Sequence, residues 1–125
     1  MRRVLLILFL LCWCISVGMA SGGSSTKSRD NWGAIAYSES TGRHGYVYDY
    51  PTQADAINSA VERCRARDCR AVVWFRNSCA ALAKGGTNYG YSIGDTRAVA
   101  ESKALAECRK RGGGCRILQW VCTSR

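Results

Sequence analysis

The segment CRAVVWF at Cys69–Phe75 decides the fold of this chain, because nearly the same segment, CRILQWV, returns at Cys115–Val121. The segments before each of them also match in order, and in the helical part the offset is constant. Four landmark pairs are each 44 positions apart: Thr52 and Thr96, Ala56 and Ala100, Ala60 and Ala104, Cys64 and Cys108. Self-similarity at a fixed offset indicates an internal repeat. The sequence therefore predicts a duplicated domain, with a first repeat at about 32–78 and a second at about 79–125.

Each copy has the pattern of two strands, a helix and a third strand. Residues 45–50, GYVYDY, alternate as a strand does, and GYSIGDT at 90–96 matches them. Thr52 followed by Asp55 is typical of a helix start, and the glycine run from Gly112 stops the second helix. We therefore expect an α+β domain with a mainly antiparallel sheet and two helices, stabilised by disulfides.

The last strand of each copy is apolar on both faces, which predicts a central strand that is covered on two sides. Trp74 and Trp120 match between the copies and are expected in the core. A second apolar stripe, on the second strand of each copy, is also expected in the core: Tyr46, Tyr48 and Tyr50, with Tyr91 and Ile93. The alternative for this stripe is an exposed surface that stacks on bases or sugars.

The first twenty residues have the pattern of a cleaved secretory signal peptide. Arg2 and Arg3 precede an apolar run at 4–17 that is shorter than a membrane span, and small residues follow at 18–20. The alternative is an uncleaved membrane anchor. Residues 21–31 are polar and rich in glycine and serine, which predicts a flexible leader. Cleavage would leave no stable membrane span, and the expected location is secreted or periplasmic.

Signal cleavage would leave 105 of the 125 residues, which is the size of one small domain. Cleavage would also remove two of the 18 Lys and Arg, so that 16 stand against 9 Asp and Glu, a net charge of +7. This charge favours anionic partners and carries no information about the fold.

Six cysteines remain after cleavage: Cys64, Cys69, Cys79, Cys108, Cys115 and Cys122. An even number in an exported domain predicts three disulfides. Zinc sites use closer cysteine pairs or several histidines, and His44 is the only histidine. In each copy one cysteine ends the helix and another starts the next strand, which favours local bridges Cys64–Cys69 and Cys108–Cys115. Cys79 and Cys122 would then join the two halves. Fifteen connectivities are possible, so this pairing is a hypothesis.

The combined motifs WGAIAYS, VVWFRNSCAALA, GYSIGDT and CRILQWVC resemble the exported bacterial domain-of-unknown-function family four-one-eight-nine. The resemblance covers about Trp32 to Cys122. It implies a secreted or periplasmic, cysteine-bearing domain, and some members of the family look like exported effectors. It supplies no catalytic residues for this chain.

Residues suited to catalysis are few. The carboxylates of Glu39 and Asp49, around the first hairpin, are candidates for glycoside hydrolysis, and His44 is the candidate base. Each also has a plainer interpretation as a turn or solvated-loop residue. The sequence lacks a G-x-S-x-G motif, and SIGDTRA lacks the lysine of a phosphate loop. No metal and no cofactor is expected.

Basic residues flank the C-terminal end of each predicted helix. The candidate anion- or partner-binding residues are Arg63, Arg65, Arg67 and Arg70 in the first copy, and Arg109, Lys110, Arg111 and Arg116 in the second. Duplication would make them two equivalent cationic patches for a polyanion. The alternative is that these cations complement the helix dipoles, at about 0.3–1 kcal/mol each.

The function expected from these observations is that of an exported, non-catalytic binding module. A protein partner is expected, and the chain would act as a periplasmic immunity or inhibitor protein or as a secreted effector. One alternative is a basic protein that binds an anionic envelope polymer. The other is a small envelope hydrolase that uses Glu39, His44 or Asp49. Nucleic acid is not the expected partner.

Overall fold

The computed structural model describes residues 30–124. Eight elements follow one another: β1 (Trp32–Tyr37), β2 (His44–Tyr50), α1 (Gln53–Cys64), β3 (Arg70–Arg76), β4 (Cys79–Lys84), β5 (Tyr89–Gly94), α2 (Arg97–Arg109) and β6 (Arg116–Cys122). Each copy has the predicted order of strand, strand, helix and strand. The prediction of a duplicated α+β domain with mainly antiparallel sheet is thereby confirmed.

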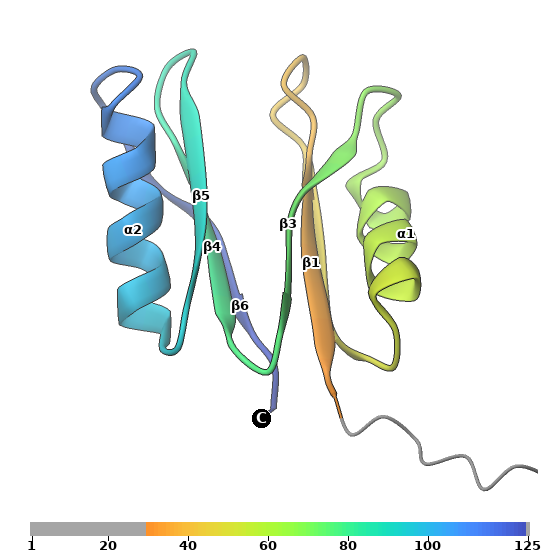
Figure 1. The fold of residues 1–125 in the computed structure, drawn as a ribbon. Helices are drawn as coiled ribbons and strands as arrows, with labels where there is room; N and C mark the ends of the chain where they lie inside the picture. Colours follow the sequence, from red (N-terminus) through yellow and green to blue (C-terminus); the bar gives the residue numbers. More distant parts are fainter. Residues whose placement is uncertain (1–29, 125) are drawn as a thin grey trace, which may run out of the picture.

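The two copies stack into four layers, with the sheets face to face and the helices outside (Figure 1). Each copy forms one three-stranded antiparallel sheet, in the orders β2-β1-β3 and β5-β4-β6. The first strand of each copy is therefore central, and β3 and β6 are edge strands. The prediction of a central last strand is wrong, because β3 and β6 each pair with only one neighbouring strand, β1 and β4.

Large apolar side chains fill the layer between the sheets, and small ones fill the layers under the helices. Ile35 and Leu82 are fully buried between the sheets, beside Phe75. Burial of side chains of this size stabilises the fold by about 1.5–3 kcal/mol each. Under the helices the buried residues include Ala60 and Ala104, which leave room for each helix to approach its sheet closely.

Two glycines let the helices come this close. A Cβ added at Gly45 on β2 would lie 2.5 Å from the backbone oxygen of Ala60 and 2.5 Å from the backbone nitrogen of Cys64. A Cβ added at Gly90 on β5 would lie 2.2 Å from the backbone nitrogen of Cys108. The last turn of each helix therefore rests directly on a strand.

Both helices begin at a threonine cap, as the repeat predicts. Thr52 Oγ1 accepts a hydrogen bond from the backbone N–H of Asp55, and Thr96 Oγ1 accepts one from Val99, each at 3.2 Å. Each bond satisfies a backbone donor that the first helical turn leaves unpaired.

The structure joins the three cysteine pairs that were predicted: Cys64–Cys69, Cys108–Cys115 and Cys79–Cys122. The expectation that Cys79–Cys122 links the two halves is wrong, because both residues belong to the second sheet, directly opposite each other on β4 and β6. In the first sheet Trp32 and Arg76 occupy the matching opposed positions, with the guanidinium 5.6 Å from the indole ring centre. One copy thus has a disulfide where the other has a cation–π pair.

The β1–β2 turn, the α1–β3 loop, the β4–β5 turn and the α2–β6 loop all lie at one end of the molecule (Figure 1). The two ends of the described chain lie at the opposite end (Figure 1). The predicted signal peptide at 1–20 and most of the leader at 21–31 fall outside the described residues. Within residues 30–124, none of the helices has the length and apolar character needed to cross a membrane.

Candidate functional site

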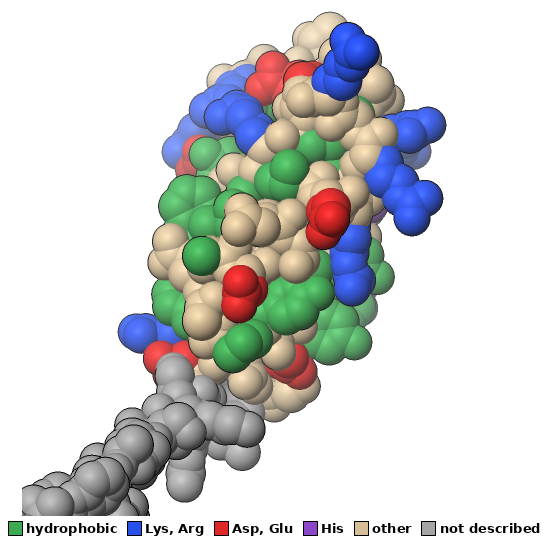
Figure 2. All heavy atoms as spheres, turned by 90° about the vertical axis from the view of Figure 1, so that its right-hand side faces the viewer, with side chains coloured by type: hydrophobic (Ala, Val, Ile, Leu, Met, Phe, Trp, Pro, Cys, Tyr) green, Lys and Arg blue, Asp and Glu red, His purple; other side chains and the backbone are tan. Residues whose placement is uncertain are grey.

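Most of the positive charge of residues 30–124 gathers at the end that carries these four turns and loops, which we call the cationic end. Ten Lys and Arg lie in its loops, in the last helical turns or in the adjoining strand residues: Arg43, Arg63, Arg65, Arg67, Arg70, Lys84, Arg109, Lys110, Arg111 and Arg116. Only four acidic residues lie in the same segments: Glu39, Glu62, Asp68 and Glu107. Most Lys and Arg side chains on the face that carries α1 gather over its upper half (Figure 2).

All eight basic residues predicted from the sequence are exposed and lie at this end. The sequence predicted two separate patches, whereas the stacking of the sheets brings both patches to one end. Contacts between the copies join them, since Lys84 Nζ lies 6.0 Å from the ring centre of Tyr37. Sequence reasoning missed Arg43 and Lys84, although each borders a predicted hairpin turn.

Seven arginines of the cationic end have no acidic partner within 4.0 Å among residues 30–124: Arg43, Arg63, Arg65, Arg67, Arg109, Arg111 and Arg116. Some charges of this end are engaged by other groups. Arg70 pairs with Glu39, and Lys110 pairs with Glu107. The guanidinium of Arg111 lies 6.0 Å from the ring centre of Tyr89. Unpaired arginines concentrate positive potential at this end and leave their N–H groups available to an anion.

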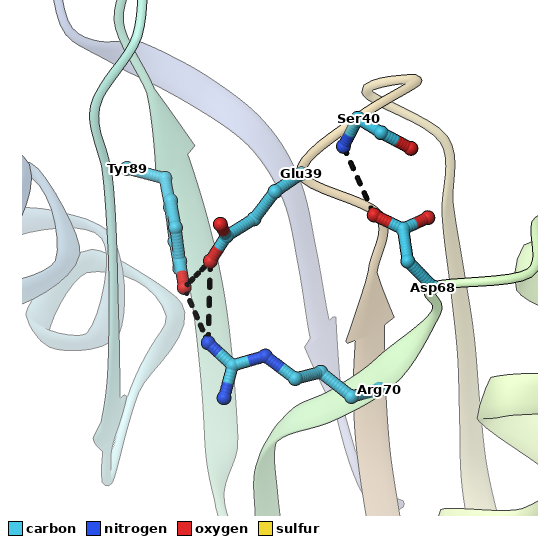
Figure 3. A network of polar contacts seen from close by, with 5 residues as sticks. All are labelled: Glu39, Ser40, Asp68, Arg70 and Tyr89. Carbon is cyan, nitrogen blue, oxygen red and sulfur yellow. Dashed lines mark hydrogen bonds and ion pairs between the residues drawn. The ribbon is translucent and has the colours of Figure 1, made fainter.

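A network of three side chains fastens the two sheets together below this end (Figure 3). The Tyr89 hydroxyl, on β5, donates to Glu39 Oε1 at 2.5 Å and accepts from Arg70 Nη2, on β3, at 2.7 Å. Arg70 Nη2 also donates to Glu39 Oε1 at 3.3 Å. These hydrogen bonds from Tyr89 and Arg70 hold the pKa of Glu39 below its ordinary value, while burial raises the pKa of Tyr89.

Asp68 ties the α1–β3 loop to the β1–β2 turn (Figure 3). Its Oδ1 accepts from Ser38 Oγ at 2.5 Å, and its Oδ2 accepts from the backbone N–H of Ser40 at 3.0 Å. The hydrogen bond from Ser38 is the main reason that the pKa of Asp68 is lowered. The Cys64–Cys69 disulfide closes the same loop from the other side. Loop and turn are therefore held in a defined arrangement.

A hollow of about 560 Å³ lies between this turn and this loop, lined by Ser40, Thr41, Arg43, Arg65, Ala66, Arg67 and Asp68. Arg43 Nη1 donates to the backbone oxygen of Arg65 at 3.0 Å across it. Three arginines thus border one recess, in which Asp68 already accepts hydrogen bonds on both oxygens.

The residues considered for hydrolysis are not brought together. Glu39 is engaged by Tyr89 and Arg70 in the network above. His44 Nε2 donates to Gln119 Oε1 at 3.2 Å, and Asp49 accepts from the backbone N–H of Ser124 at 2.8 Å. The carboxylate of Glu39 belongs to the β1–β2 turn, whereas Asp49 lies five positions beyond His44 near the far end of β2, roughly 17 Å further along the extended chain. Glycoside hydrolysis needs carboxylates within about 5–10 Å of each other. Within residues 30–124, no group of three His, Cys, Asp or Glu is placed to hold a metal ion.

The predicted burial of the aromatic stripes is wrong. Tyr46 and Tyr91 are each 40% exposed and Tyr48 is 54% exposed, and Ile93 on β5 is also exposed. These residues lie on edge strands, beyond the area that the facing sheet covers. Tyr50 is half-buried against α1, on the opposite face from Tyr48. The cause is a register shift in the β1–β2 ladder, where Asp49 adopts φ 60°.

The two matching tryptophans are also exposed, Trp74 by 43% and Trp120 by 38%. They stand opposite Ala34 and Ala81, on the helix-facing side of the edge strands β3 and β6. Each helix packs mainly over the other two strands of its sheet, so it leaves this side open. The guanidinium of Arg97 covers Trp120, at 3.9 Å from the ring centre.

A second recess, of about 330 Å³, opens along the edge strands β2 and β6. Its lining consists of Tyr46, Tyr48, Gln119, Trp120, Val121 and Cys122. We call it the tyrosine groove. It combines exposed aromatic surface with the polar His44–Gln119 hydrogen bond at its upper end.

Comparison with known proteins places this architecture among bacterial domains. The model of the family described as "Domain of unknown function (DUF4189)" matches residues 32–122. Protein Rv1269c of Mycobacterium tuberculosis is 41% identical over 96 residues, which are 77% of this chain and 73% of the relative. Uncharacterized protein Rv1813c of the same organism is 38% identical over 92 residues, 74% of this chain and 60% of the relative. The NMR structure of Rv1813c matches with a TM-score of 0.57 and 36% identity, over 74% of each chain.

Proposed function

Since the chain belongs to the DUF4189 family of domains of unknown function, we propose its function from its surface: an exported, non-catalytic binding module that holds an anionic envelope polymer by its cationic end. Three disulfides in one small domain are typical of oxidising compartments, which supports a secreted or periplasmic location. The dispersed positions of Glu39, His44 and Asp49 favour binding over hydrolysis.

The observation that carries this proposal is the gathering of both copies' unpaired arginines at one end. Cations that only complemented the helix dipoles would need to lie near each helix C-terminus, and one or two per helix would suffice. This end carries ten Lys and Arg against four acidic residues, and seven of the arginines lack an acidic partner among residues 30–124. A net charge of +6 over one end attracts polyanions and raises their association rate.

The proposal is tested by binding of the disulfide-bonded mature chain to fluorescently labelled poly(glycerol phosphate) at several salt concentrations. The logarithm of the affinity should fall linearly with the logarithm of the salt concentration, because binding releases counterions from the polymer. The double variant Arg65→Gln/Arg109→Gln, with one change in each copy, should bind more weakly and show a shallower salt dependence.

The matched control is Arg76→Gln/Lys103→Gln, which removes the same charge outside the cationic end and should retain most of the affinity. Absence of binding at low salt, or equal losses in the two double variants, would overturn the proposal. Circular dichroism of each variant establishes that it is folded.

The tyrosine groove favours a second candidate, binding of a protein partner, as an immunity protein, an inhibitor or an effector would require. Tyrosine and tryptophan are enriched at the residues that dominate protein interfaces, and Tyr48 is the most exposed of the aromatic residues named above. Crosslinked capture with wild type and Tyr48→Ser tests this candidate. A partner retained through a high-salt wash by wild type and lost by Tyr48→Ser would support it, and equal retention would refute it.

A further inference from the structure

The duplication provides an internal reference for the recess between the β1–β2 turn and the α1–β3 loop. At the matching place in the second copy Asn88 stands where the first copy has Arg43. The Asn88 side-chain amide donates to the backbone oxygen of Cys108 at 2.9 Å, which fastens the turn to the end of α2. Arg43 makes a similar bond one residue further along, to the backbone oxygen of Arg65 at 3.0 Å. A short neutral side chain therefore satisfies the fold, and the positive charge of Arg43 is additional.

The backbone conformation of Arg65 also indicates that the positive charge of the first copy is not required by the fold. It caps α1 in the left-handed conformation, with φ 57°. Glycine and asparagine tolerate this conformation best, and a long side chain here costs backbone strain. Strained residues that persist are frequent at functional sites. In the second copy the matching cap region is right-handed at Lys110 and the loop contains a glycine run. The first copy therefore retains an arginine where the backbone disfavours it.

The backbone that carries the charges of this recess is held in place before any ligand arrives. Asp68 fastens the loop to the turn, and the Cys64–Cys69 disulfide closes the loop. The Asp68 carboxylate accepts a hydrogen bond on each oxygen, so it is occupied from within the protein. Arg65 and Arg67 have no acidic partner within 4.0 Å among residues 30–124. The cations of this recess outnumber its single carboxylate by three to one.

From these observations we propose that the recess bordered by Arg43, Arg65 and Arg67 is a binding site for a single phosphate ester group. Guanidinium groups match the oxygens of phosphate in a bidentate fashion, and three of them can surround a tetrahedral anion. The volume of about 560 Å³ lies within the range of ligand sites and admits the phosphate with its first attached groups. This inference rests on the proposed function and names the chemical group that the cationic end selects.

The second copy offers a charge-matched control. Arg109 and Lys110 occupy the positions that match Arg65 and Ala66, but Lys110 pairs with Glu107 and Asn88 replaces Arg43. A general electrostatic field would make cations of the two copies equivalent. A specific site in the recess would make the cations of the first copy contribute more to the affinity than those of the second copy.

The test is an NMR titration of the disulfide-bonded mature chain with glycerol 3-phosphate, and with glycerol as the neutral control. We expect shifts confined to residues around the recess with the phosphate and none with glycerol. Arg65→Gln/Arg67→Gln should lose at least about tenfold in affinity, whereas Arg109→Gln/Lys110→Gln should stay within about twofold. Arg43→Asn, which restores the second copy's arrangement, should keep the fold and lose about tenfold in affinity.

The outcomes separate this inference from the proposed function. Equal losses of affinity in the two double variants would overturn the proposed phosphate site in the recess and leave the proposed function of the cationic end standing. The same holds if glycerol 3-phosphate causes no shifts while salt-sensitive polymer binding persists. Loss of polymer binding as well would overturn both. If the site is confirmed, poly(glycerol phosphate) and phosphatidylglycerol vesicles, compared between wild type and Arg43→Asn, identify whether the phosphate comes from a polymer or from a lipid headgroup.

Discussion

Replacing Gly45 by alanine should destabilise the domain strongly, because the added methyl group has no space. The ideal Cβ would lie 2.5 Å from the backbone oxygen of Ala60 and 2.5 Å from the backbone nitrogen of Cys64. Ordinary contact begins at 3.4 Å, so strand and helix must separate by about 0.9 Å along this direction. The atoms in the way are backbone atoms of the last turn of α1, which the disulfide at Cys64 restrains.

Overpacking of this kind usually costs 1–3 kcal/mol, and we expect about 3 kcal/mol here because no flexible side chain can give way. For a domain of this size that corresponds to a fall in melting temperature of about 12–24 °C. Thermal unfolding followed by circular dichroism at pH 7 measures it. Gly86→Ala is the matched control, since no atom lies within 4 Å of an added Cβ there. A melting temperature for Gly45→Ala within about 2 °C of wild type would refute the account of how α1 is seated.

Three further predictions concern the disulfides, the sheet-to-sheet network and the tryptophans. Replacing both Cys79 and Cys122 by alanine should lower the free energy of unfolding in urea by about 4 kcal/mol, against about 2 kcal/mol for removal of either local disulfide. The reason is that the Cys79–Cys122 disulfide closes a segment of 43 residues, whereas the local disulfides close segments of 5 and 7. Equal losses of unfolding free energy would contradict this. Because the pKa of Glu39 is lower in the folded state than its unfolded value of 4.5, ionised Glu39 stabilises the fold above pH 4.5, and this stabilisation is lost as the pH falls through the folded pKa. Glu39→Gln should therefore lose less unfolding free energy than wild type below pH 4.5. An unchanged pH profile of the unfolding free energy would contradict this. Arg97→Gln should uncover Trp120, shift its fluorescence to longer wavelength and cost about 0.5–1 kcal/mol, and an unchanged emission spectrum would show that the stacking does not persist in solution.

The repeat made much of the fold predictable. Matching Cys64 to Cys108 aligned the two helices, and the local cysteine pairs followed from the helix-to-strand spacing in each copy. The threonine caps were equally visible, because a cap depends on a few neighbouring residues. The family resemblance is confirmed by the match over residues 32–122. All of these features are local in sequence or repeated within it.

The arrangement of the two copies relative to each other was not predictable in the same way. Alternation along CRAVVWF shows two apolar faces, but it does not show that Phe75 meets the other sheet while Trp74 stays exposed. Tyr50 changes faces because of one left-handed residue, Asp49, which no periodicity reveals. The cationic end depends on both helices finishing at the same end of the stack, and that follows from how the sheets pack.

The position of the chain ends has a practical meaning for how such a protein is handled. Residues 30 and 124 emerge at the end opposite the cationic loops (Figure 1). Immobilisation on a biosensor through a terminal biotin would therefore present the arginines outward, toward the analyte. Random coupling through amines would instead consume Lys84 and Lys110 and turn the cationic loops toward the chip. The choice of attachment chemistry thus decides whether a surface-based assay can detect anion binding at all.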